Sequence, residues 1–153
     1  MPEHHATVTW KSTADDFLTG KYSREHTWSF DGGAVIQASP APAVVPPPMS
    51  NPALIDPEEA FVASLSSCHM LTYLYLAGRE KFAIESYEDH AVGVMAKNEQ
   101  GIPWVKLVTL HPKIVYTGPK VPTPVDEHRL HHLAHQQCFI ANSVKTEIVV
   151  EFA

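Results

Sequence analysis

The chain has 153 residues, a formal net charge of −6, 44% hydrophobic residues and 18% charged residues. This composition is typical of a folded protein with a buried core and excludes a disordered chain, so we expect a single domain over residues 1–153. Lysine and arginine form no cluster that could follow a phosphate backbone, so nucleic acid is not an expected partner.

The first five residues lack the basic and then apolar pattern of a secretory signal, so we expect a cytoplasmic protein. Residues 60–77 are the longest apolar stretch, but serine, cysteine, histidine and threonine interrupt it. The stretch is barely long enough to cross a bilayer. We interpret it as a helix of a soluble protein that is buried on nearly all sides, and we expect no membrane partner.

Three short segments with alternating polarity predict strands at residues 6–10, 24–30 and 34–38, the last two joined by a tight turn at 31–33. A proline-rich segment follows at 39–52, with six prolines that exclude a helix or a central strand. This segment is either a flexible linker or a stiff wall beside a pocket.

A long helix is predicted from Pro57 to about Arg79, because Asp56, Pro57 and Glu59 form the pattern of a capping box with proline at the first helical position. A strand at 84–95 follows.

A second long strand is predicted at 104–116, where Pro112 indicates an edge or a bulge. A second helix begins after Thr123 and ends near Cys138, and a last strand covers 144–152. The order βββ-α-ββ-α-β indicates an α+β fold with a mainly antiparallel sheet.

Cys68 and Cys138 are the two cysteines, and their separation fits no zinc or CxxC spacing. If the fold brings them together, one thiolate can be oxidised by peroxide to a sulfenic acid and the other thiol can condense with it to a disulfide. The alternative is that both are small buried residues without a chemical role.

Glu58 lies ten positions before Cys68, about 15 Å along one helix axis, which is too far for contact. An antiparallel second copy of the helix could place Glu58 of one chain beside Cys68 of the other, which favours a homodimer. A reactive thiolate also needs a cation nearby. Arg24 is the candidate because it begins a strand that faces the core; the alternative is an ordinary arginine at a strand edge.

Histidines cluster in the second predicted helix, where His131, His135 and Cys138 share one face. Such a face can bind a metal, but no second segment supplies further ligands. We therefore favour a solvated histidine-rich face and expect no metal site.

Residues 56–61 with 66–69, and residues 138–143, resemble the two sequence motifs of the OsmC/Ohr family, and the resemblance covers nearly the whole chain. It implies an OsmC-like fold, an intertwined homodimer with the long helices at its centre, and sites at the subunit interface. It also implies that Cys68 is the peroxidatic thiol and Cys138 the resolving thiol. Glu58 matches the family glutamate by its spacing, and Arg24 matches the family arginine.

Phe139 departs from the better-studied peroxidases of this family, which tend to have proline there. We expect a cytoplasmic, thiol-dependent peroxidase that reduces organic hydroperoxides, with an external dithiol as reductant and no cofactor. Phe61, Met49 and nearby prolines would form the wall of its pocket. The alternatives are a non-enzymatic module that binds a small hydrophobic ligand at the dimer interface, and a metal-binding protein that uses the histidines of the second helix.

Overall fold

The structure is a computed structural model that describes residues 1–13 and 16–152. The chain divides into two compact units, Met1–Ala60 and Phe61–Ala153, and each is described by itself. The single domain expected from the sequence stays a prediction.

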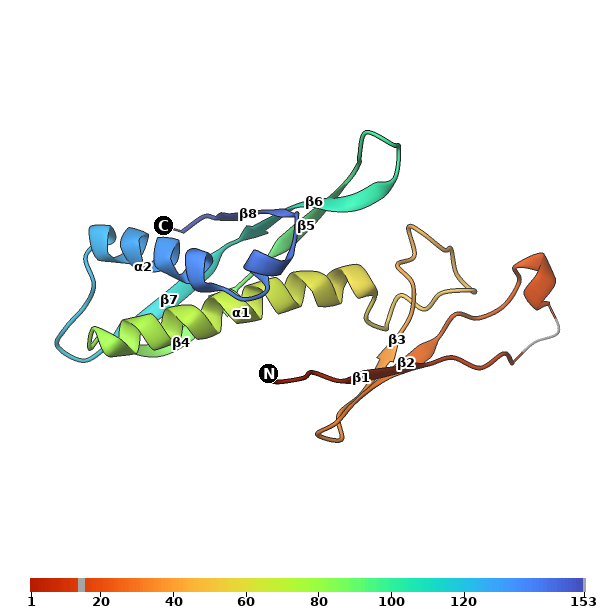
Figure 1. Cartoon of the computed structure of the whole chain (residues 1–153), viewed down its shortest axis with the longest axis horizontal. Coiled ribbons are helices and arrows are strands. Elements are labelled where there is room, and N and C mark those ends of the chain that lie inside the picture. The colour runs from red at the N-terminus through yellow and green to blue at the C-terminus, as the bar shows by residue number, and fades with distance from the viewer. Residues whose placement is uncertain (14–15, 153) are drawn as a thin grey trace. The chain divides into compact units, whose positions relative to one another are not determined.

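The first unit contains an antiparallel sheet of β1 (Ala6–Thr9), β2 (His26–Phe30) and β3 (Val35–Ala38), in that spatial order (Figure 1). A short 3₁₀ helix, η1 (Phe17–Thr19), lies between β1 and β2. Gly33 has a φ of 95° in the turn between β2 and β3, a conformation that glycine adopts without steric cost. The three predicted strands are therefore confirmed, although β2 begins two residues later than expected.

The proline-rich segment forms turns that hydrogen bonds hold in place. Ser39 and Ser50 are buried, the backbone N–H of Asn51 donates to Ser39 Oγ at 2.8 Å, and Ser50 Oγ donates to the Val45 carbonyl at 2.6 Å. These contacts are typical of an ordered wall and not of a free linker.

The long helix α1 (Pro57–Arg79) begins where the sequence predicts. Asp56 Oδ1 accepts from the Glu59 N–H at 2.8 Å, and Glu59 Oε2 accepts from the Asp56 N–H at 3.1 Å. This reciprocal capping box satisfies two backbone donors that a helix start would otherwise leave unpaired.

The second unit contains five strands: β4 (Ala83–Asp89), β5 (Val92–Lys97), β6 (Pro103–Leu110), β7 (Pro112–Thr117) and β8 (Glu147–Val150). β4 pairs with β7 and β5 with β6 in antiparallel fashion, whereas β8 runs parallel to β6. The fold is thus α+β and mainly antiparallel, as expected. The two long strands predicted at 84–95 and 104–116 are wrong as single strands, because each is divided in two.

Asp89 explains the division. Its Oδ1 accepts the backbone N–H of His111 at 2.6 Å, and its Oδ2 accepts the hydroxyl of Ser66 on α1. Pro112 has no N–H to continue the ladder. A side chain therefore replaces the strand pairing at the point where both strands bend.

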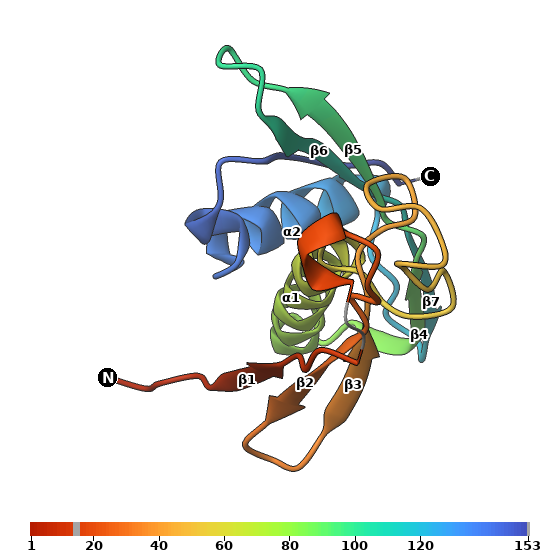
Figure 2. The ribbon, with the colours of Figure 1, turned by 90° about the vertical axis from the view of Figure 1, so that its right-hand side faces the viewer.

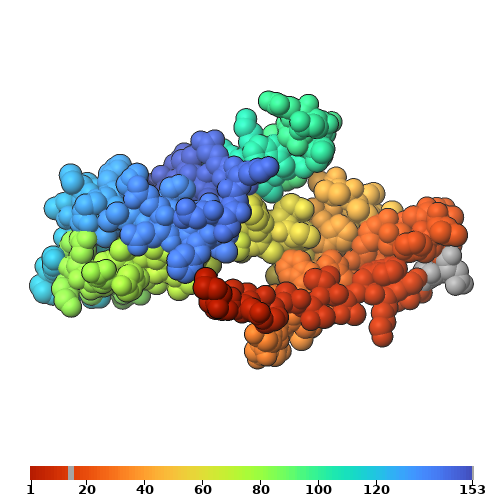
Figure 3. Space-filling model, viewed as in Figure 1, coloured from red at the N-terminus to blue at the C-terminus, as the bar shows by residue number. Residues whose placement is uncertain are grey.

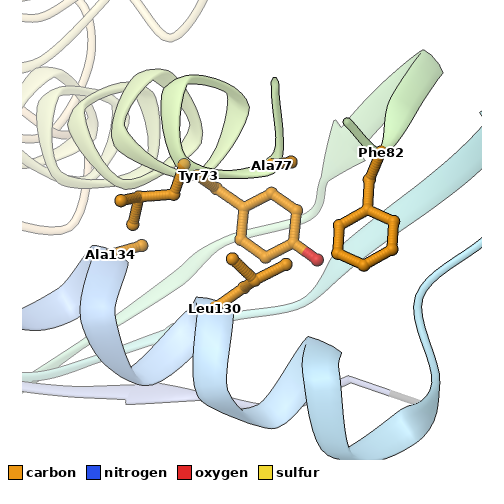
Figure 4. Packing of buried hydrophobic residues seen from close by; sticks show 6 residues of the cluster. Tyr73, Ala77, Phe82, Leu130 and Ala134 are labelled. Carbon is orange, nitrogen blue, oxygen red and sulfur yellow. The ribbon is translucent and has the colours of Figure 1, made fainter. Parts of the chain in front are cut away.

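The second helix, α2 (Pro124–Gln137), begins with a capping box of Thr123 and Asp126. α1 and α2 lie side by side in both ribbon views (Figures 1 and 2). Tyr73 and Ala77 of α1 pack against Leu130 and Ala134 of α2 (Figure 4). A second cluster joins Leu65 to Val108 and Leu110 of β6.

One face of α1 remains exposed, so burial on nearly all sides is wrong for the single chain (Figure 3). Ala63, Ser67, Leu71 and Tyr75 follow one another at four-residue spacing along this face, and we call them the α1 stripe. Leu71 is 59% exposed and Tyr75 61%. Among the described residues, α1 is also the one helix long and apolar enough to cross a membrane, a property that core helices of soluble proteins share.

Candidate active site

The fold brings Cys68 and Cys138 together. Cys68 lies in the middle of α1 and is half-buried, whereas Cys138 ends α2 and is fully buried, and both are free thiols. Burial raises the pKa of the Cys138 thiol to about 11, and interaction with the nearby Cys68 side chain adds to the effect. The two thiols therefore lie close enough for their side chains to interact.

The segment after Cys138 folds back over its sulfur and carbonyl. The backbone N–H of Ala141, at the start of the 3₁₀ helix η2 (Ala141–Ser143), donates to Cys138 Sγ at 3.4 Å. Asn142 Nδ2 donates to the carbonyls of Cys138 and Gln136, each at 2.9 Å. The motif at 138–143 thus fixes the position of one thiol, while Phe139 points to solvent and is 83% exposed.

Glu58 lies in the first turn of α1 and is half-buried. Burial raises the pKa of its carboxyl group, and the neighbouring Asp56 carboxylate raises it further. Among the described residues Glu58 forms no ion pair, neither with Arg24 nor with another cation. Its position ten residues before Cys68 on a continuous helix keeps the two residues of one chain apart.

Arg24 precedes β2 and does not begin it, contrary to the sequence prediction. Its Nη1 donates to the carbonyls of Gly20 at 3.1 Å and Tyr22 at 2.9 Å, and its guanidinium lies over the Tyr22 ring, 3.9 Å from the centroid. Arg24 belongs to the first unit and Cys68 to the second, so its action on the Cys68 thiolate stays a prediction.

Arg24 also borders an apolar cavity of about 430 Å³ in the first unit. The aromatic rings of Trp10 and Phe17 pack around Tyr22, with centroids 5.5 Å and 4.8 Å from it. The residues that line the cavity are Val8, Trp10, Phe17, Tyr22, Arg24, His26, Pro40 and Pro57. Such a cavity can hold an apolar molecule with one polar end at a guanidinium.

The expected pocket walls are only partly those observed. Pro40 of the proline-rich segment lines the cavity, as expected, but Met49 does not. Phe61 packs instead against the core of the second unit.

Two histidines form a buried pair that the sequence analysis missed. His69 of α1 is 1% exposed and His131 of α2 is 3% exposed, and His69 Nε2 lies 3.0 Å from His131 Nδ1. Burial lowers the pKa of His69 to about 4 and that of His131 to about 3, so the pair is neutral at neutral pH. The solvated histidine face is correct for His128 and His132, which are exposed, but wrong for His131. The available signal was that His131 stands beside Leu130, in the apolar stripe of α2.

Within residues 1–13 and 16–152, no three histidine, cysteine or carboxylate side chains gather in a way that could bind a metal ion. The arrangement of the α2 histidines therefore gives the metal-binding alternative no support.

Comparison with known proteins places this arrangement in a family. The family described as OsmC-like protein matches residues 50–153. An OsmC-like protein of unknown function from Vibrio cholerae has 52% sequence identity and a TM-score of 0.97, with 100% of both chains covered. No curated protein matches this chain.

More distant structures share the fold. An organic hydroperoxide resistance protein from Elizabethkingia anophelis has a TM-score of 0.70 and 21% identity, with 99% of this chain and 94% of that chain covered. The organic hydroperoxide resistance protein OhrB of Bacillus subtilis has a TM-score of 0.68 and 16% identity, with 99% and 98% covered. The family match over residues 50–153 and the 52% identity to the Vibrio protein lead to one conclusion: this chain belongs to the OsmC-like protein family.

Proposed function

We propose that this protein is a cysteine-based peroxidase that reduces organic hydroperoxides. The observation that carries the proposal is the contact between a half-buried thiol, Cys68, and a fully buried one, Cys138. A peroxide can reach the Cys68 thiol, and the Cys138 thiol is close enough to form a disulfide with Cys68 after its oxidation.

The reaction has three steps. The Cys68 thiolate attacks the distal oxygen of the hydroperoxide, the O–O bond breaks, and the alkoxide takes up a proton and leaves as an alcohol. Cys138 then attacks the sulfur of the Cys68 sulfenic acid, and water leaves as the disulfide forms. An external dithiol supplies two electrons and two protons and restores both thiols.

Burial gives the two cysteines different roles. The raised pKa of Cys138 keeps its proton on sulfur, so this thiol does not compete with Cys68 for the peroxide.

Glu58 and Arg24 are proposed to hold the thiolate, Arg24 by its charge and Glu58 by orienting Arg24. Two observations support these roles. Arg24 borders the apolar cavity, and the half-buried Glu58 carboxyl has no cation among the described residues. An antiparallel homodimer, in which Glu58 of one chain approaches Cys68 of the other, would supply the missing partners.

The apolar cavity supports a bulky, apolar hydroperoxide as substrate. Two structural neighbours are named organic hydroperoxide resistance proteins, and these names agree with this substrate class. We further propose that the protein acts in the cytoplasm, where dithiol reductants are at hand.

Steady-state turnover of cumene hydroperoxide with dihydrolipoamide as reductant tests the proposal. Cys68→Ser should abolish turnover, and Cys138→Ser should allow one oxidation and then stall. Val125→Ala, a change at an exposed residue of α2, is the control and should keep full activity. Turnover that survives in Cys68→Ser would reject the enzyme, and full steady-state activity in Cys138→Ser would reject the resolving role.

A binding module is the second candidate, favoured by the same apolar cavity. It predicts thiols that do not respond to hydroperoxide, together with saturable binding of an apolar ligand that the double variant Cys68→Ser/Cys138→Ser retains.

A further inference from the structure

His135 contains a buried polar atom with no partner. Its Nδ1 is shielded from solvent and forms no hydrogen bond to any described residue. Buried nitrogen atoms of this kind are rare, because the lost hydrogen bond to water is normally replaced within the protein. The nitrogen atom is therefore free to accept a proton or a hydrogen bond from a neighbouring side chain during a reaction step.

Helix geometry places His135 beside the cysteine pair. His135 lies in the last turn of α2, three positions before Cys138, the residue that caps the helix, and this spacing favours side chains on one face. Cys138 has a φ of −68° and a ψ of 117°, so the backbone leaves the helix only after the Cα atom of Cys138. Residues on both sides of His135 approach α1, because His131 lies within hydrogen-bond distance of His69 and Cys138 interacts with the Cys68 side chain.

The buried histidine pair is a titratable neighbour of His135. His69 lies within electrostatic reach of His135, and both His69 and His131 have lowered pKa values, so the pair is neutral at neutral pH. Asp89, a carboxylate on β4, also lies within electrostatic reach of His69. The titratable groups near the pair are His135 and Asp89, which interact with His69, and His128 and Tyr73, which lie near His131.

Cys138 must lose a proton when it forms a disulfide, and it has no direct route to water. Its exposed fraction is 0%, and its sulfur contacts the Ala141 N–H and the Cys68 side chain. A thiol that must react in such a place needs a base inside the protein.

We propose that His135 is this base: its Nδ1 accepts the Cys138 proton while Cys138 attacks the oxidised sulfur of Cys68. This inference rests on the proposed function. A lone pair of Cys138 Sγ forms the S–S bond, the S–O bond of the sulfenic acid breaks, and the hydroxide that leaves takes the proton from His135 to become water. Cys138 is oxidised, the sulfenic sulfur is reduced, and His135 ends neutral.

A disulfide reagent separates this step from peroxide chemistry. Dithiodipyridine reacts first with Cys68, which releases one thiopyridone. Cys138 then attacks the mixed disulfide and releases a second, so two absorbance phases report the two cysteines. We expect His135→Gln to leave the first phase unchanged and to slow the second by about a hundredfold at neutral pH, the scale of a lost general base.

The pH profile distinguishes a base from a structural residue. In His135→Gln the second phase should rise about tenfold per pH unit, because only thiolate formed by hydroxide can react. In the unaltered protein the same phase should level off well below the pKa of Cys138, which is about 11. The profile of the unaltered protein requires no variant to fold, and a steady rise up to that pKa would overturn the proposal.

His132→Gln is the matched control, because His132 is an exposed histidine of the same helix. It should change neither phase. His135→Asn serves as a second replacement and should behave as His135→Gln does. Equal second-phase rates in the unaltered protein and in His135→Gln would contradict the proposal, as would slowing of both phases with an unchanged pH profile. If the protein does not react with hydroperoxide but its second phase still depends on His135, the proposed peroxidase activity is rejected, whereas the role of His135 as a base is supported.

Discussion

Among single residues, the buried histidine pair should make the folded protein less stable at low pH. The folded protein holds His69 and His131 neutral, with pKa values of about 4 and about 3, below the ordinary 6.5. Between about pH 4 and about pH 6.5, the unfolded chain therefore binds more protons than the folded protein. The stability associated with the pair is therefore fully present above about pH 6.5 and is lost as the pH falls toward about 4.

Each histidine of the pair should lower the free energy of unfolding by about 2 kcal/mol between about pH 7 and about pH 5. His69→Gln/His131→Gln should be less sensitive to acid over this interval, because glutamine does not titrate. Urea unfolding at the two pH values measures the difference. His132→Gln should keep the acid sensitivity of the unaltered protein, and an equal sensitivity in the double variant would refute the role of the pair.

The sequence predicts only those features of the candidate site that depend on the spacing of residues within one segment. Cys68 and Cys138 could be named, but their contact depends on how α1 and α2 pack, which no local pattern contains. The same holds for His131, whose burial depends on a partner in α1. Arg24 has no local motif, and its action on Cys68 stays a prediction.

At the scale of elements, helix starts were predictable because a capping box is a local structure. Both observed boxes, Asp56 with Glu59 and Thr123 with Asp126, lie where the sequence indicates a helix start. The division of the two long strands was not predictable, because it depends on a contact between Asp89 and His111 that are distant in the chain.

Thr123→Ala should lower the free energy of unfolding by about 1 kcal/mol, because the Asp126 N–H loses the hydroxyl that accepts from it. The control is Val125→Ala in the same helical turn. Val125 is 77% exposed and alanine has the higher helix propensity, so this change should not destabilise. Urea unfolding of both variants tests the cap, and equal stabilities would contradict its contribution.

Gly93 on β5 permits the close approach of α1. A Cβ atom at this position would lie 2.6 Å from Cγ2 of Val62. Gly93→Ala should therefore destabilise by about 1–3 kcal/mol, the usual cost of overpacking. Gly32→Ala, at a site with open space, should have little effect.

Val62→Ala should restore part of the stability lost in Gly93→Ala, because it removes the clashing methyl group. A double-mutant cycle in urea measures this coupling. Strict additivity of the two changes would contradict direct contact between the side chains.

At the scale of the whole molecule, the α1 stripe is an unpaired apolar face on the central helix. Leu71 and Tyr75 are more than half exposed, which is unusual for large side chains of a long core helix. We interpret the stripe as the surface where a second copy packs, as the resemblance to the OsmC/Ohr family implied. A dimer would also complete the proposed site.

Leu71→Glu should convert the expected dimer to a monomer, because it places a charge in an apolar interface. Sedimentation measures the mass of the particle, which should be about twice 16.9 kDa for the dimer and 16.9 kDa for the monomer. Val121→Glu, at an exposed position before α2, is the control and should remain dimeric. A monomeric unaltered protein would contradict the assembly, and with it the role of Glu58 across the interface.

Intact-mass analysis after one equivalent of cumene hydroperoxide shows whether Cys68 and Cys138 form a redox pair. We expect a loss of about two mass units that a dithiol reverses and that Cys68→Ser abolishes. Cys138→Ser should instead gain about sixteen units as a sulfenic acid. Hydrogen peroxide in parallel should react more slowly if the apolar cavity selects the substrate. An unchanged mass after minutes with both oxidants would contradict the account and leave the thiols as structural residues.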